Sequence, residues 1–146
     1  MTRAWIAIFL FLVQTLACAT EEPSYRPSRV VYDFSNSNPK ILGQMLDRAS
    51  FLQKIYQDDV FESSIVFVIH EGAVPLFVKH AGSPFQEMMH RARSLVMGEI
   101  IQFRICEASA AMQGFKENDF QDFVKMVPMG DAEIIKLQHQ GYAYLK

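Results

Sequence analysis

Short apolar runs rich in β-branched residues alternate along this sequence with segments whose apolar residues recur every three or four positions. The run Ile65–Ile69 is apolar throughout, which is typical of a parallel strand buried on both faces. Arg29–Phe34 has the pattern of a first strand. Strands that alternate with helices are joined by right-handed crossovers, which place helices on both faces of the sheet. The sequence therefore predicts a single-domain, three-layer α/β/α fold with a mainly parallel, doubly wound sheet of about five strands.

Cap and turn residues set the limits of the predicted helices. Asn38 is placed to cap a first helix and Pro39 to occupy its first position. Gly98 ends a second helix, in which apolar residues recur over Phe85–Val96. A strand at Glu99–Cys106 follows, and then two short helices, at Glu107–Gln113 and near Asp119–Phe123. The last predicted elements are a strand at Lys125–Pro128, a helix at Asp131–Gln140 and a final strand at Tyr142–Leu145.

The strand Glu99–Cys106 differs from the other strands because its residues alternate in polarity. One face is apolar, and the other carries Gln102, Arg104 and Cys106. This pattern predicts that one side of the sheet meets water, a cleft or a second subunit at this strand.

The first residues have the organisation of an export signal. Arg3 precedes the apolar run Ile6–Val13, and Ala17-Cys18-Ala19 offers a cleavage site after Ala19. The apolar run is shorter than the roughly 20 residues that span a bilayer, so no stable membrane insertion is expected after processing. We predict a signal peptide at 1–19, a linker at 20–28, a folded domain at 29–146, and a periplasmic or secreted product. The alternative is a lipoprotein anchored through Cys18, because residues 15–18 resemble a bacterial lipobox.

Charge and motif content exclude several classes of partner. The formal net charge is −2 and the basic residues are dispersed, which argues against nucleic-acid binding. The isolated Gly72 and Gly82 do not form a phosphate-binding loop. The spacing of His80, His90 and His139 does not indicate a zinc site. We therefore expect neither a cofactor nor a metal.

Cleavage after Ala19 would leave Cys106 as the sole thiol and rule out an intramolecular disulfide. The sequence also lacks a Cys-x-x-Cys pair, which disfavours a thioredoxin-like oxidoreductase. Three readings of Cys106 remain: an inert buried thiol, an intermolecular bridge that senses redox state, or a reactive group.

The C-terminal third of the sequence resembles the signature of the DsrE-like family, which includes DsrE, DsrF and YchN-like proteins. The pattern is VP-x-G-x-AEII-x-LQ-x-x-GYAY, and it runs from Val127 to Tyr144. Val68–Pro75 and Phe103–Cys106 extend the resemblance, which covers roughly Arg29–Lys146. It implies a doubly wound parallel sheet and a homo-oligomer, commonly a trimer or hexamer. The best-known branch of the family relays sulfur as a cysteine persulfide, which implies a sulfur-donor protein as a partner.

Cys106 matches the position of the reactive cysteine in sulfur-relay members, and it is the candidate catalytic residue. A ligand in an open α/β sheet binds outside the carboxyl ends of the strands, where this cysteine is expected. A following helix favours the thiolate through its dipole. Arg104 on the same strand face would add positive charge, whereas Glu107 would oppose it.

His70 is expected at the end of the second strand, and it faces the same rim as Cys106 if the second and third strands are neighbours. The alternative is a helix-capping or surface histidine. His70, Glu71 and Gly72 are candidate binding or supporting residues, with Gly72 allowing close backbone approach. Asn36 is expected at the same rim, where turn chemistry is its simpler explanation.

Two functions follow from these observations. The first is an exported DsrE-like protein that accepts sulfur at Cys106, at most a sulfurtransferase or sulfur carrier. The alternative is a non-catalytic, oligomeric domain that binds a ligand or a protein and whose Cys106 is inert.

Overall fold

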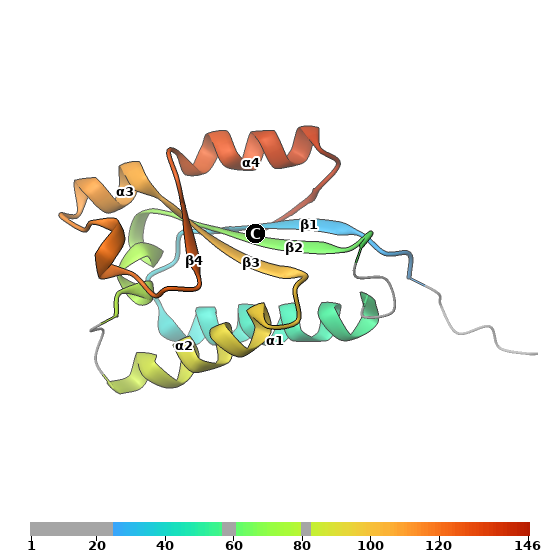
Figure 1. Cartoon of the computed structure of the whole chain (residues 1–146), viewed down its shortest axis with the longest axis horizontal. Coiled ribbons are helices and arrows are strands. Elements are labelled where there is room, and N and C mark those ends of the chain that lie inside the picture. Colours follow the sequence, from blue (N-terminus) through green and yellow to red (C-terminus); the bar gives the residue numbers. More distant parts are fainter. Residues whose placement is uncertain (1–24, 57–60, 80–82) are drawn as a thin grey trace, which may run out of the picture.

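Five parallel strands form one sheet in the computed structural model, which describes residues 25–56, 61–79 and 83–146 (Figure 1). The order across the sheet is β4–β3–β2–β1–β5. The predicted signal peptide at 1–19 lies outside the described residues, as do His80 and part of the predicted linker. The strands are β1 (Arg29–Phe34), β2 (Ser64–Ile69), β3 (Ile101–Cys106), β4 (Val124–Val127) and β5 (Ala143–Leu145).

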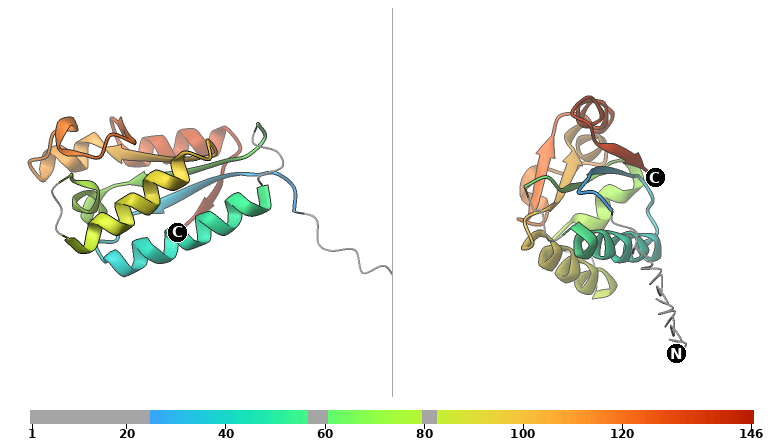
Figure 2. Two further views of the ribbon diagram at one scale, coloured as in Figure 1. Left: turned by 60° about the horizontal axis from the view of Figure 1, so that its bottom comes forward. Right: turned by 90° about the vertical axis from the view of Figure 1, so that its right-hand side faces the viewer.

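Helices cover both faces of the sheet. Helices α1 (Pro39–Tyr56) and α2 (Ser83–Val96) lie side by side on one face, and α4 (Gly130–His139) lies on the other (Figures 1 and 2). The short helix α3 (Glu107–Met112) follows β3 directly. This arrangement confirms the predicted three-layer, doubly wound α/β fold. Among the described helices, none is both long and apolar enough to cross a membrane.

The two faces of the sheet are buried to different extents. Toward α1 and α2, a large core includes stacked rings of Tyr32, Phe67 and Phe103, with centroids 4.7 and 4.9 Å apart. Toward α4 the core is small and consists of Val31, Val66, Val68, Ile134 and Leu137. Because one ten-residue helix cannot cover the whole face, polar side chains occupy the remainder of it.

In strand β3, side chains alternate between the well-covered face of the sheet and the poorly covered one. Ile101, Phe103 and Ile105 are buried toward α1 and α2, whereas Gln102 is exposed on the α4 side. Arg104 is half-buried on the same side. The predicted polar face of this strand is confirmed.

Three local features differ from expectation. The third strand begins at Ile101 because Glu99, with φ of 67°, belongs to the preceding turn. A 3-10 helix, η1 (Glu71–Phe77), was not anticipated. The second short helix is a single 3-10 turn, η2 (Glu117–Asp119), rather than a helix near Asp119–Phe123. Asp119 accepts a hydrogen bond from the Lys116 amide, which caps the start of this turn. The residue after the turn, Phe120, is buried and pairs with Val78.

Candidate functional site

A small cavity lies where the carboxyl ends of β2, β3 and β4 meet. The parallel register pairs Ile69 with Ile105 and Cys106 with Val127, so the residues that follow these strands share one edge of the sheet. The volume of the cavity is about 160 Å³. Its lining residues come from the segments that follow the three strands: His70, Glu71, Cys106, Ala108, Ser109, Met112, Met129, Gly130 and Asp131.

Cys106 ends β3 and caps α3, so its sulfur lies at the start of a helix. The Cys106 Sγ accepts a hydrogen bond from the backbone amide of Ser109, with N and S 3.4 Å apart. The residue is 4% exposed, and its thiol is the free one among the described residues. The cysteine is therefore buried, but it borders a cavity.

His70 is held by a carboxylate that the sequence did not reveal. Its backbone amide donates to the carbonyl of Phe34 at 3.1 Å, which fixes the residue at the end of β2. Its Nε2 lies 2.6 Å from Oδ1 of Asp33 on β1. When Asp33 is ionised, Nε2 carries the proton it donates, and in the neutral imidazole Nδ1 is then left as an acceptor.

Tyr144 completes this network from the edge strand β5. Its hydroxyl donates to Oδ2 of Asp33 at 2.5 Å. Burial alone would raise the pKa of Asp33, but the hydrogen bonds from His70 and Tyr144 outweigh it and lower that pKa. The same hydrogen bond raises the pKa of Tyr144, because it stabilises the protonated phenol. Three neighbouring strands thus contribute one hydrogen-bonded chain, Tyr144–Asp33–His70.

Gly130, the first residue of α4, lies between His70 and Cys106. A Cβ placed on this glycine would stand 3.3 Å from the Cβ of His70 and 3.5 Å from the Cβ of Cys106. The distance to His70 is tighter than most van der Waals contacts and the distance to Cys106 is an ordinary one, so a side chain here would fill space between the two residues. The close approach also shows that His70 and Cys106 are near neighbours across the start of α4.

Arg104 shares a sheet face with Cys106 but is directed toward α4. Its guanidinium donates to Glu133 and, at 2.9 Å, to Gln102. Burial alone would raise the pKa of Glu133, but hydrogen bonds from Lys136 and Arg104 keep it below its usual value. Among the described contacts of Arg104, none is a hydrogen bond to the sulfur of Cys106.

The other predicted residues are divided between the cavity and the loop beside it. Glu71 lines the cavity. Gly72 packs against the loop after β1, because a Cβ there would be 3.1 Å from the carbonyl oxygen of Ser35. Its lack of a side chain thus allows close packing of the chain at this position. Asn36 lies in the same loop, where its side chain accepts a hydrogen bond from the amide of Asn38 at 2.8 Å. Asn36 is a turn residue and does not line the cavity.

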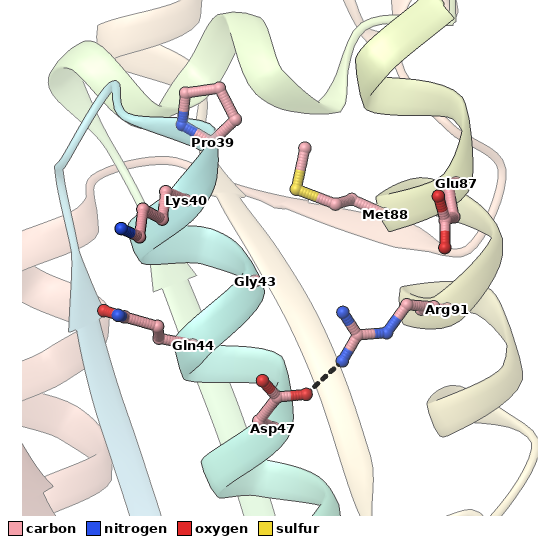
Figure 3. Close-up of a pocket in the computed structure, with 8 residues that line it drawn as sticks. All are labelled: Pro39, Lys40, Gly43, Gln44, Asp47, Glu87, Met88 and Arg91. Carbon is pink, nitrogen blue, oxygen red and sulfur yellow. Dashed lines mark hydrogen bonds and ion pairs between the residues drawn. The ribbon is translucent and has the colours of Figure 1, made fainter.

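A larger hollow of about 420 Å³ lies between α1 and α2, away from Cys106 (Figure 3). Asp47 on α1 and Arg91 on α2 form an ion pair across it, whereas Lys40 and Gln44 point away from α2. The part of the chain that the structure describes contributes no cysteine or histidine to its lining, and two of its charges neutralise each other. The smaller cavity is therefore the candidate functional site.

Comparisons with known proteins agree with this fold. The sequence model of the DsrE/DsrF-like family matches residues 24–146. A protein of unknown function, MTH1491 from Methanobacterium thermoautotrophicum, has a similar structure, with a TM-score of 0.68 and 19% identity over 81% of this chain and 97% of that one. The ychN protein from E. coli is also similar, with a TM-score of 0.60 and 12% identity over 80% of this chain and 96% of that one. No curated protein matches the sequence.

Proposed function

This chain belongs to the DsrE/DsrF-like family, and from that premise we propose that it carries sulfur as a persulfide on Cys106. Family membership supports a sulfur-relay type of protein, and the proposal assigns the acceptor atom. The observation that carries it is the position of Cys106 at a strand end, bordering a cavity that it shares with His70. The amide of Ser109 and the nearby His70–Asp33 pair supply what a thiol needs to react.

The transfer step needs no external oxidant. The thiolate of Cys106 attacks the outer sulfur of a donor persulfide, R–S–SH. A new S–S bond forms between that sulfur and Sγ, while the S–S bond of the donor breaks and its thiolate leaves. In this proposal His70 Nδ1 accepts the thiol proton of Cys106 beforehand and returns a proton to the leaving thiolate. The donor we propose is a persulfide-bearing protein.

A direct test is incubation of the purified protein with sodium polysulfide, followed by mass spectrometry of the intact chain. Cys18 should first be replaced by serine, so that Cys106 is the sole thiol. We expect the mass of one or more added sulfur atoms, removed by a reductant and absent in Cys106→Ser. A chain that takes up no sulfur at Cys106 would contradict the proposal.

The burial of Cys106 favours a second candidate function. At 4% exposure the thiol has the environment of an inert core cysteine. The domain would then be a non-catalytic, oligomeric binding protein that uses the cavity edge. Resistance of Cys106 to both polysulfide and alkylating reagents in the folded protein would favour this function.

Two further proposals concern the state of the protein in the cell. We propose that the chain is exported by cleavage after Ala19, on the strength of its N-terminal sequence pattern. We also propose a homo-oligomer, a trimer or hexamer. The family resemblance supports it, and the uncovered polar strip of β3 offers a contact surface.

A further inference from the structure

Soft donor atoms are concentrated around the cavity. Besides Cys106, its lining residues include Met112 and Met129, whose side chains carry thioethers, and His70, whose side chain carries an imidazole. Both methionines are exposed, Met112 by 89% and Met129 by 51%. Methionine is among the residues most often buried, so two exposed methionines beside one cysteine need an explanation.

Three separate elements bring these donors together. Cys106 and Met112 stand at the two ends of α3, Met129 caps α4, and His70 follows β2. Gly130 allows the start of α4 to approach His70 and Cys106, so Met129 is held at the same cavity. When Asp33 is ionised, Nε2 of His70 carries the proton that it donates to the carboxylate, which leaves Nδ1 as the ring atom able to bind a metal.

The charge around the cavity favours a cation. Glu71 and Asp131 are among its lining residues, and the described residues that line it include no lysine or arginine. The nearest arginine on the same sheet face, Arg104, is paired with Glu133. The N-termini of α3 and α4 act in the opposite direction, but acidic residues in their first turns, Glu107 and Asp131, offset them.

We infer that Cys106, Met112 and Met129, with Nδ1 of His70, form a binding site for copper(I). Thiolate and thioether ligands select this soft ion, and imidazole also suits it. Harder or borderline ions are not favoured, because the described residues contain no group of three or more His, Cys, Asp or Glu that could hold a metal. Binding would release the thiol proton of Cys106 and leave the oxidation state of the metal unchanged.

This inference goes beyond the proposed sulfur chemistry and does not depend on it. Both use the sulfur of Cys106, so bound copper(I) and a persulfide would exclude each other. The two methionines distinguish the two proposals, because the inferred copper(I) site uses their thioethers as ligands, whereas the proposed sulfur-transfer step assigns them no role.

The experiment is an anaerobic titration of the purified Cys18→Ser protein with copper(I), against a chromophoric copper(I) chelator as competitor. We expect one ion per chain, and loss of binding in Cys106→Ser. Met112→Leu and Met129→Leu should each weaken affinity at least about tenfold, since even loss of a group that only orients a ligand typically costs that much. Met97→Leu is the matched control, because Met97 is 80% exposed but lies outside the cavity lining.

Unchanged affinity in the double variant Met112→Leu/Met129→Leu would overturn the inference, as would a Met97→Leu variant that loses affinity equally. The polysulfide assay on the same double variant separates the two proposals, because we expect this variant to take up sulfur but not to bind copper(I).

The parent protein gives two further outcomes. If it takes up sulfur but does not bind copper(I), the metal inference alone is wrong. Copper(I) binding without sulfur uptake would end the sulfur proposal alone.

Discussion

Nε2 of His70 and Oδ1 of Asp33 are 2.6 Å apart, which joins the carboxyl ends of two neighbouring strands and orients the imidazole. The carboxylate fixes which ring nitrogen carries the proton, and therefore which one can accept a proton from a nearby thiol. This pair gives the proposed chemistry a structural basis that Cys106 alone would lack.

Replacing Asp33 by asparagine should slow the reaction of Cys106 with iodoacetamide near neutral pH. An asparagine side chain can donate to Nε2 and favour the wrong tautomer of His70. Because a positioned base contributes about 10²-fold or more, we expect a decrease of at least about tenfold. The measurement is the alkylation rate as a function of pH. Asp131→Asn is the control, since Asp131 lines the cavity but is not bonded to His70 in the structure. Identical profiles for the parent and Asp33→Asn would refute the role of the pair.

The stability of the protein should decrease in acid. The pKa values of Asp33 and Glu133 lie below their ordinary values of 3.8 and 4.5. A carboxyl group with a lowered pKa stabilises the folded state while it is ionised. Its contribution is complete above the ordinary pKa and is lost as the pH falls through the lowered one. Urea unfolding at a series of pH values from neutral to about pH 3 should show this loss.

Glu133→Gln identifies one source of that dependence. We expect a flatter pH profile, together with a loss of about 1–3 kcal/mol at neutral pH, because Arg104 loses a charged partner. Glu87→Gln serves as the control, since Glu87 is exposed on α2. Equal pH profiles for Glu133→Gln and the parent would show that this carboxyl does not contribute.

Replacement by alanine should have different effects at two glycines: it should slow alkylation of Cys106 at one and stabilise the fold at the other. Gly130→Ala places a methyl group 3.3 Å from His70 and 3.5 Å from Cys106, so it should hinder alkylation of Cys106. Gly43→Ala, in the middle of α1, has open space around the new methyl group and should raise the free energy of unfolding by about 0.8–1.0 kcal/mol. Alkylation kinetics and urea unfolding of both variants test this difference. Faster alkylation of Gly130→Ala would contradict the assigned geometry.

The mature N-terminus should be Thr20. The pattern Ala17-Cys18-Ala19 after a short apolar run predicts signal cleavage after Ala19. N-terminal sequencing or intact mass of the protein expressed in a bacterial host with its full leader provides the check. A diacylated Cys18 recovered with the membranes would favour the lipoprotein alternative instead.

The purified protein should be a trimer or a multiple of one. Light scattering at micromolar concentration measures this directly. If β3 contributes to the contact, Gln102→Glu should weaken the assembly by placing a charge on the exposed strip, whereas Gln86→Glu on the exposed surface of α2 should not. A monomer at this concentration would remove support for the proposal.

Local patterns were sufficient to predict much of the fold and part of the site. Parallel strands bring their carboxyl ends to one edge, and this rule placed His70 and Cys106 together without knowledge of tertiary contacts. Asp33 was missed because it lies in an otherwise apolar strand, although a lone carboxylate there is itself a signal.

Other features depend on contacts between distant parts of the chain. Arg104 was expected beside the thiol, but its partner Glu133 lies 29 residues later on α4. Gly130 belongs to the family pattern, but its position between His70 and Cys106 depends on the path of the chain after β4. Sequence periodicity carries no information about either contact.

The position of β5 has a consequence for the order of assembly. This strand pairs with β1, from which it is separated by more than a hundred residues. During synthesis, β1 can pair with β2 early but must wait for residues 143–145 on its other edge. Contacts so distant in sequence form slowly because a long loop must close first. Tyr144 reaches Asp33 only at that last step, so the hydrogen-bonded support of His70 is complete only when the sheet is.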